Sequence, residues 1–490
     1  EYMKKYIAIL AGTILTLSSL NAQTGLQSAY FLDGYNMRRS FNPAFASERS
    51  FFSLPALGGF GMGLNSNMGV NTFLFPTSDG QLTTFMGPEV SASDFLGRLK
   101  NNNRLNVNAS ASLLTLGIWG KNGFFSFDAN VKADVTANIP YELLEFVKNP
   151  GKSQYYDISD LAVGGNARLE LAFGYRRTIA DRINVGARLK LLAGLADVDA
   201  RVDKMRIEMT EDRWSVHSNG TLKASCGFLD IKTKGESGSA ESSDENDIID
   251  FGNIGPTDTW TYDKIVSGYG AALDLGADFE LIRGLRLSLA ICDLGFISWK
   301  NSTLAETGEQ GWVFDGFENI AINGGEENSI DEQFNALGDG LEDLYEFRRT
   351  STNGKRSDML ACTLTAGAEY TMPFYDGLSV GIMSSTTFKG PYTKTSNRLY
   401  ANLKPCNWFS MSVNGALSSF GGGLGFILGL HPKGFNFFIG SDYLMTQFAK
   451  ATDNGIPYPY GKLRMQMNFG MSFSIGKRHD LRSKLPLIDL

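Results

Sequence analysis

The chain has 490 residues, a formal net charge of −7 and no long basic run, so its composition gives no support to nucleic-acid binding. A zinc site or a disulfide scaffold is not expected either, because only three histidines occur and the four cysteines lie far apart, at Cys226, Cys292, Cys362 and Cys406. The 55 glycines, 34 phenylalanines and only 14 prolines are instead typical of a β-barrel that spans an outer membrane.

Residues 1–22 are expected to be a secretory signal peptide and not part of the fold. Lys4 and Lys5 precede a short apolar core, and "SLNAQ" offers a cleavage point after Ala22. The apolar core is too short to cross a bilayer as a helix, which favours a cleaved leader. No cysteine follows the cut, so a lipid anchor is not expected.

Residues 23–56 form a turn-rich segment directly before the first predicted strand. The stretch "YFLDGYNMRRSFNPAFASERSFF" contains Arg38 and Arg39 and then a turn at Asn42, Pro43 and Ala44. Its many aromatic side chains are unsuited to a free tail in water. Because the nearest compartment to the first strand is the mouth of the lumen, we expect this segment to lie inside the barrel as a plug.

Residues 57–476 show the alternation of apolar and polar residues that predicts transmembrane strands. In "LRMQMNFGMSFSIG", seven apolar residues from Leu463 to Ile475 alternate with polar residues or glycine. Similar alternation covers 125–135, 166–176, 183–190 and 269–281. A large soluble all-β protein is the alternative, but it does not explain charged side chains along the second face of so many long strands.

The connections between these strands fall into two classes. Six are short turns, such as "WGKNG" and "HPKG", and they alternate with seven mostly longer, more polar loops. The pattern predicts an all-β fold, a 14-stranded antiparallel transmembrane β-barrel with long extracellular loops. The even number of strands places both ends of the barrel in the periplasm, and residues 477–490 form a periplasmic tail.

The polar faces of the strands predict a charged lumen. Buried charges need partners, so Arg38 and Arg39 of the plug are expected to pair with acids on the wall; the alternative is that both are solvated. The candidate charge network on the wall comprises Asp128, Asp134, Arg168, Glu170, Arg188, Asp274, Asp278 and Glu280.

Two long loops have distinctive compositions. Residues 236–250 are acidic, but the residue order of a calcium-binding EF-hand is absent, so a solvated loop is favoured over a cation site. Residues 300–357 are expected to form an extracellular lid that includes a short helix. A groove for a partner is the alternative role of its apolar stripe, which comprises Phe334, Leu337, Leu341, Leu344 and Phe347.

No arrangement of residues typical of catalysis is present. His217, His431 and His479 are isolated from one another, and no GxSxG, HExxH or P-loop pattern occurs. We therefore expect no enzymatic activity, no cofactor and no metal.

The stretch from Tyr30 to Pro76, which contains the Asn-Pro-Ala element, resembles the FadL-like superfamily of outer-membrane barrels. This superfamily includes the long-chain fatty-acid and aromatic-hydrocarbon transporters and the PorV-type proteins of the type IX secretion system. The stretch is most similar to an uncharacterised barrel family common in Bacteroidota, strongly over residues 28–76 and diffusely elsewhere. The resemblance also implies that the segment before the first strand folds inside the barrel as a hatch.

The resemblance implies passive uptake of a small hydrophobic compound across the outer membrane of a Gram-negative bacterium. The alternative is a structural barrel that docks other proteins in an outer-membrane or type IX secretion assembly, as PorV-type proteins do. The expected partners are outer-membrane lipid, a small hydrophobic ligand and, in the alternative, an outer-membrane protein. An apolar lumen pocket would favour uptake, whereas a sealed lumen and an apolar loop surface would favour docking.

Overall fold

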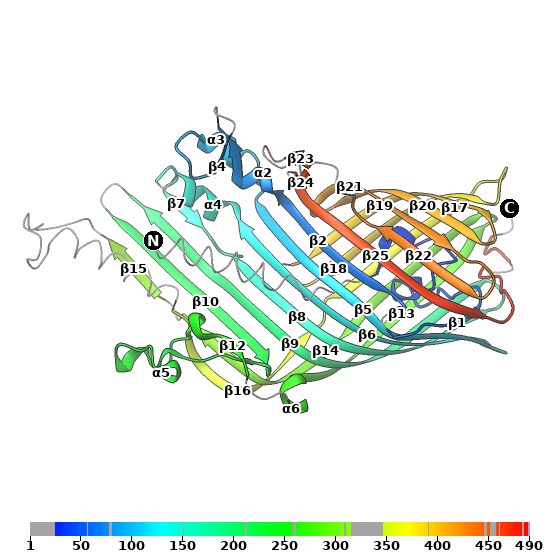
Figure 1. Cartoon of the computed structure of the whole chain (residues 1–490), viewed down its shortest axis with the longest axis horizontal. Helices are drawn as coiled ribbons and strands as arrows, with labels where there is room; N and C mark the ends of the chain where they lie inside the picture. The colour runs from blue at the N-terminus through cyan, green and yellow to red at the C-terminus, as the bar shows by residue number, and fades with distance from the viewer. Residues whose placement is uncertain are drawn as a thin grey trace, which may run out of the picture.

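The computed structural model describes residues 25–55, 57–77, 81–149, 151–210, 213–257, 261–307, 310–314, 346–390, 392–444, 448–450, 457–459, 461–482 and 485–488. They form a closed 14-stranded antiparallel β-barrel, which confirms the fold predicted from the sequence (Figure 1). The last strand, β25 (Lys462–Ile475), closes the barrel, because it pairs with β22 on one side and with β1 and β2 on the other.

The wall strands follow one another around the barrel in chain order. They are β1 (Ser50–Phe52) with β2 (Phe60–Gly69), β5 (Asn102–Gly120), β6 (Gly123–Pro140), β8 (Ala162–Ile179), β9 (Ile183–Met209), β13 (Gly268–Ile282), β14 (Leu285–Glu306), β16 (Arg348–Met359) with β17 (Cys362–Thr371), β18 (Leu378–Phe388), β19 (Lys394–Cys406), β20 (Phe409–Ser418), β21 (Gly421–Leu430), β22 (Phe435–Ser441) and β25.

Two wall strands are interrupted. β1 and β2 both pair with β5 and β25, so they form one strand that is broken at residues 53–59. β16 and β17 both pair with β14 and together form the eighth strand. Since β1 already belongs to the wall, the plug ends before Ser50 and not at the expected residue 56; we use residues 25–49, its described part, as the plug.

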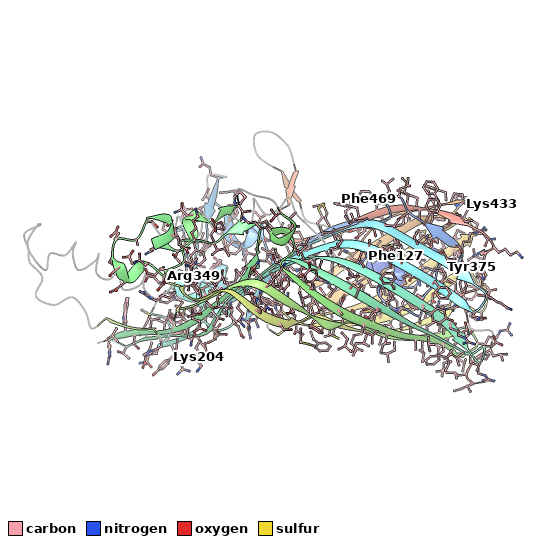
Figure 2. The ribbon with its side chains drawn as sticks, turned by 90° about the horizontal axis from the view of Figure 1, so that it is seen from below. Phe127, Lys204, Arg349, Tyr375, Lys433 and Phe469 are labelled. Atoms are coloured by element: carbon pink, nitrogen blue, oxygen red, sulfur yellow. The ribbon has the colours of Figure 1, made fainter. Side chains whose placement is uncertain are left out.

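Side chains of the wall alternate between the lumen and the outside, as the strand period of two requires. Phe125 and Met467 face outward and are 52 % and 45 % exposed, whereas Asp128 faces inward and is 2 % exposed. Figure 2 shows Phe127 and Phe469 on the outer surface of the barrel. An apolar outer band around a polar interior is the arrangement expected of a barrel in a bilayer.

The two ends of the barrel differ. All six short turns lie at one end, the turn end, which Lys433 and Tyr375 mark in Figure 2. The opposite end, the loop end, carries the longer connections. In barrels of this class the short turns are periplasmic and the long loops extracellular. Among the described helices, none has the length and apolar character needed to cross a membrane.

Part of the wall continues far beyond the loop end. β9 has 27 residues and β14 has 22, whereas about 9–11 residues suffice for a strand to cross the bilayer. β10 (Trp214–Cys226) inserts between the ends of β9 and β14, and β15 (Gln310–Phe314) adds to β10. We call this region the sheet extension; it runs to the left in Figure 1 and carries Lys204 in Figure 2.

The loops contain short elements that cover the loop end. They are α2 (Val70–Phe73), β3 (Leu74–Pro76), β4 (Leu82–Thr84), α3 (Ala92–Leu96), α4 (Tyr141–Lys148), β7 (Tyr155–Asp157), β11 (Leu229–Asp230), α5 (Lys234–Ser237), η4 (Ser243–Glu245), η5 (Phe251–Asn253), β12 (Gly255–Pro256), α6 (Tyr262–Ile265), β23 (Phe448–Lys450) and β24 (Pro457–Pro459). Two apolar clusters pack beneath them, one around Phe95 of α3 and one around Tyr156 of β7.

Candidate functional site: the plugged lumen

The plug, residues 25–49, lies inside the barrel toward its turn end, where it is dark blue in Figure 1. It contains two single-turn helices, η2 (Gln27–Ala29) and η3 (Arg38–Ser40). Tyr30, Phe31 and Phe45 are each no more than 5 % exposed. The Tyr30 ring meets the Phe31 and Phe45 rings edge-on, with centroids 4.9 and 5.2 Å away. The aromatic residues therefore form a small core between the plug and the wall.

The turn at 42–44 seats against two glycines of the wall. Gly186 of β9 and Gly276 of β13 are opposite each other in the ladder. A Cβ atom at Gly186 would lie 2.0 Å from the Pro43 carbonyl oxygen, and one at Gly276 would lie 2.0 Å from Asn42 Oδ1. Only glycine allows so close an approach of another backbone, so this pair forms a seat for the turn.

The Asn42 side chain attaches the same turn to the wall. Its Nδ2 donates to the carbonyl oxygens of Ala277 and Leu289, at 3.1 and 3.3 Å. Its Oδ1 accepts the N–H of Ala44 at 2.9 Å, which closes the turn. An asparagine amide is suited to this position because it donates and accepts at once.

Four other wall glycines lie directly under plug side chains. These pairs are Gly367 under Tyr30, Gly381 under Phe31, Gly425 under Ser28 and Gly440 under Leu26. In each pair, a Cβ atom on the glycine would lie only 2.5–2.7 Å from the nearest atom of the plug side chain. Much of the glycine on the lumen face of these strands therefore makes room for the plug.

Arg39 makes a charged contact between the plug and the wall. It forms an ion pair with Asp128 of β6, in which Nε lies 3.2 Å from Oδ2, and it also donates to Thr115. Arg188 of β9 lies 3.0 Å from Asp128 and 3.4 Å from Asp274 of β13. The four charged side chains are at most 3 % exposed, so the ion pairs are shielded from water.

The network continues along the wall toward the loop end. Lys190 Nζ lies 2.8 Å from Asp274, 2.7 Å from Asp293 and 3.9 Å from Glu170, and Lys132 pairs with Glu170 at 2.8 Å. Lys132, Lys190 and Asp293 were not candidates from the sequence. The two lysines lie on inward faces that alternation identifies, but Asp293 has a φ of 60° at an irregularity of β14, where alternation fails.

Arg38 has a different partner from Arg39. It pairs with Asp33 of the plug itself at 2.6 Å, and its guanidinium lies over the Phe45 ring, 4.6 Å from the centroid. Arg286 of β14 connects this pair to the wall, at 3.2 Å from Asp33 and 2.7 Å from Asp278. Among the described residues, the ion pair of Arg38 is therefore with the plug itself, and Asp33 links that pair to the wall.

An acid that the sequence reasoning missed holds the first turn of the plug. Asp442, directly after β22, accepts the N–H groups of Gln27 and Ser28 at 2.9 and 2.6 Å, as a helix cap does. Arg398 of β19 lies 3.7 Å from Asp442 and donates to Gln27 Oε1 at 3.0 Å. Alternation within β19 could have identified Arg398, whereas Asp442 lies beyond the end of its strand.

The remaining charged candidates make other contacts. Arg168 donates to Asn166 at 3.0 Å. Asp134 is 3.9 Å from Lys389, close to the loop end. Glu280 accepts a backbone N–H at 2.5 Å within the β13–β14 turn and lies beside Asp278 and Arg286 at the turn end.

The predicted lid can be located only in part. Phe334, Leu337, Leu341 and Leu344 lie outside the described residues. Phe347 lies directly before β16, and its ring meets Phe251 edge-on with centroids 6.0 Å apart. It packs at the margin of an apolar cluster on the sheet extension made by Leu222, Ile249 and Ala305.

The acidic loop is held by its own side chains and by Arg349 of β16. Glu236 accepts two bonds from Arg349, at 2.9 and 2.6 Å, and these lower the Glu236 pKa. Burial alone would raise the pKa of Asp250, but hydrogen bonds from Ser237 and Asn253, among others, lower it to about 2. In the described part of the chain, no three His, Cys, Asp or Glu side chains gather as a metal site requires.

The chain beyond β25 folds back across the turn end. His479 stacks on Trp119 with ring centroids 4.3 Å apart, and Arg176 donates to the Leu481 carbonyl at 3.1 Å. The backbone of 485–488 then bonds to the ends of the β8–β9 and β13–β14 turns. The tail and the plug together cover the turn end of the lumen.

A cavity of about 150 Å³ lies on the loop side of the plug. The plug forms its floor, with Met37, Arg39 and Phe41 among the residues that line it. Its walls come from strands all around the barrel and are mostly amide, hydroxyl and charged side chains. Phe420 and Tyr443 line it near the loop end. The lumen therefore contains a polar compartment above a closed floor.

The histidines do not form a catalytic arrangement in the described structure. His431 Nε2 lies 2.7 Å from Ser410 Oγ in the β21–β22 turn, but its Nδ1 has no hydrogen-bond partner among the described residues to orient the ring. Burial lowers the pKa of His431 to about 4, so the ring is neutral at pH 7. His217 is on β10 and His479 is in the tail, far from this turn in the chain.

Comparisons with solved structures return channels and transporters at low identity. The monoaromatic hydrocarbon channel CymD is 10 % identical, with 91 % of this chain and 94 % of that chain covered and a TM-score of 0.39. The toluene transporter TodX of Pseudomonas putida is 10 % identical, with 90 % and 93 % covered and a TM-score of 0.36. A FadL homologue of Pseudomonas aeruginosa is 11 % identical, with 93 % and 95 % covered and a TM-score of 0.31.

No curated protein matches the chain. The model of one protein family, described as a family of unknown function (DUF5723), matches residues 43–442. The match begins at Pro43, inside the turn that seats on Gly186, and ends at Asp442, the acid that caps η2. Because it covers most of the chain, the protein belongs to the DUF5723 family of unknown function.

Proposed function

We propose that the protein is an outer-membrane uptake protein for a small solute, with the N-terminal plug as its gate. The observation that carries the proposal is the polar cavity of about 150 Å³ whose floor is the plug itself. A solute entering from the loop end would collect in this cavity, directly above the segment that separates it from the turn end.

The gate would open by displacement of the plug from its seat. Arg39 and Asp128 form the buried ion pair that joins the plug to the wall at the cavity floor. Replacing Arg39 removes this attachment of the plug, while Asp128 on the wall keeps Arg188 as its partner. A plug that has lost Arg39 should therefore spend more time displaced, and the lumen should conduct.

Most of the residues that line the cavity are polar, which suits a polar solute better than the small hydrophobic compound expected from the FadL-like resemblance, although aromatic residues such as Phe41 and Phe420 also offer it apolar surface. A hydrophobic solute gains free energy by leaving water for an apolar surface, but here it would meet amides, hydroxyls and ion pairs such as Lys132–Glu170. Passive uptake and the outer-membrane location remain as proposed from the sequence; the chemistry of the solute is revised.

Planar-bilayer conductance tests the gate. Arg39→Ala is expected to raise the conductance of the purified protein above that of the parent. Arg38→Ala is the matched control, since the ion pair of Arg38 with Asp33 lies within the plug, whereas that of Arg39 with Asp128 joins the plug to the wall. Heat-modifiable mobility in gels verifies that each variant is folded. An Arg39→Ala protein that is folded and conducts no more than the parent would show that the plug is not the gate.

Docking of another outer-membrane protein, as in PorV-type assemblies, is the second candidate function, and the sheet extension favours it. Its tip exposes two large side chains, Tyr155 (57 %) and Trp214 (41 %), which β9 brings close together. A photo-crosslinking residue at position 214, compared with one at Leu399 on the barrel wall, tests this in intact cells. Docking predicts one discrete adduct from position 214; the absence of any adduct there argues against docking at this tip.

A further inference from the structure

We infer that the cavity above the plug is a binding site for a small uncharged polyol, up to the size of a monosaccharide. The inference rests on the proposed uptake function and assigns its substrate class. The cavity of about 150 Å³ has room for several water molecules, since one water needs about 10–15 Å³ of such volume, and a small solute would take their place.

Most of the charged groups around the cavity are paired with one another; Lys394, which also lines it, is near Asp134 but forms no ion pair within 4 Å among the described residues. Arg39 and Arg188 share Asp128, and Lys132 pairs with Glu170. A charged solute would have to compete with these buried pairs and would leave one member uncompensated. An uncharged solute leaves all of them intact.

One wall of the cavity is made of amides. β2 lies between β5 and β25, and its glycines make room for the side chains of both neighbours. A Cβ atom at Gly61 would lie 2.3 Å from Asn468 Oδ1, and one at Gly63 would lie 2.6 Å from Asn108 Oδ1. Asn65 of β2 lines the cavity beside them. We call Asn65, Asn108 and Asn468 the amide cluster.

Each member of the amide cluster has one polar atom left unsatisfied by the described residues. These atoms are the Oδ1 of Asn65, the Oδ1 of Asn108 and the Nδ2 of Asn468. Buried amide atoms are seldom left without a hydrogen bond. These three have almost no accessible surface themselves, but their side chains line the cavity, and a rotation of each amide would present the atom to a bound solute. Two acceptors and one donor suit hydroxyl groups, which both donate and accept; an ammonium group only donates and a carboxylate only accepts.

The wall across the lumen is lined by hydroxyl groups. Thr365 of β17 and Ser385 of β18 are 3.0 Å apart, and both line the cavity. Ser396 of β19 also lines it, and its Oγ has no hydrogen-bond partner among the described residues. A polyol between the two walls could bond to amides on one side and to hydroxyls on the other, while Phe420 and Tyr443 offer apolar faces to its C–H groups.

Saturation-transfer NMR on the full-length protein, folded in detergent, tests the site. The probes are D-glucose, D-xylose and glycerol, compared with glutamate, lysine and toluene. We expect at least one of the polyols to bind the parent, and Asn108→Leu and Asn468→Leu to weaken that binding about tenfold each, the scale of one lost hydrogen bond. Asn402→Leu is the matched control, because Asn402 is a buried wall amide that bonds to Ser379 and Ser412 and does not line the cavity.

Three outcomes would overturn the inference: no polyol binds the parent, polyols bind both leucine variants as they bind the parent, or glutamate, lysine or toluene binds in preference. The uptake function is judged separately, by the swelling of liposomes that contain the parent or Arg39→Ala. Polyol binding without any effect of Arg39→Ala on swelling would refute the gate and leave the site assignment standing. Faster swelling with Arg39→Ala but no polyol binding by the parent would support the gate and refute the polyol site.

Discussion

Replacing Gly186 with alanine is expected to displace the plug and open the lumen. The new Cβ atom would lie 2.0 Å from the carbonyl oxygen of Pro43 and 2.3 Å from its carbonyl carbon. Real Cβ atoms essentially never approach heavy atoms closer than 3.0 Å, and here the atoms in the way belong to the backbone. The turn at 42–44 would therefore have to move away from β9 by about 1 Å.

The size of the effect follows from the contacts that this movement disturbs. Overpacking a well-packed position costs about 1–3 kcal/mol. The movement also disrupts the two hydrogen bonds from Asn42 to the wall, worth about 0.5–1.5 kcal/mol each. The total of about 2–6 kcal/mol shifts the equilibrium between the seated and the displaced plug by at least about 30-fold.

Single-channel recording measures this shift as the fraction of time that the barrel conducts. Gly415→Ala is the control, because a Cβ atom at Gly415 of β20 meets nothing within 4 Å. Asn42→Ala should open the lumen by a smaller factor, since it removes the hydrogen bonds without a clash. A folded Gly186→Ala protein that conducts as rarely as the parent and Gly415→Ala would refute the seat of the plug on β9.

Three further predictions concern the outside of the barrel and the loops. Phe127→Arg puts a charge on the outward face of the barrel. Near the bilayer midplane this should lower the free energy of unfolding in lipid vesicles by about 2–4 kcal/mol, as measured by urea unfolding. A variant as stable as the parent would contradict the assignment of that face. Protease added to intact cells should cut within 235–250, because exposed polar loops are preferred cleavage sites, whereas cleavage confined to the 431–434 turn would mean the opposite orientation. Hydrogen bonds lower the pKa of Asp250 to about 2 from its ordinary value of 3.8, so the stabilisation is present above about pH 4 and is lost as the pH falls toward 2. Pepsin cleavage of this loop should increase over that range in the parent, and Asp250→Asn should already be cleaved rapidly at the upper limit.

The charged groups of the lumen show what alternation can and cannot predict. It places Asp128, Glu170, Arg188 and Asp274 on inward faces, and these four belong to one connected network in the structure. It could not place Asp293, because an irregularity in β14 changes which face each residue occupies. Alternation also could not predict that Arg38 and Arg39 of the plug have different partners, because those partners depend on the path of the plug through the lumen.

The sequence by itself determined the fold, because the direction of a strand side chain depends only on its position along its own strand. The long alternating segments and the six short turns were therefore sufficient to predict the number of strands and the closed barrel. Which residues meet inside was decided by the tertiary structure alone. Gly186 and Gly276 lie more than a hundred residues from the turn that they seat, and only the register of β9 against β13 brings them together beneath Pro43.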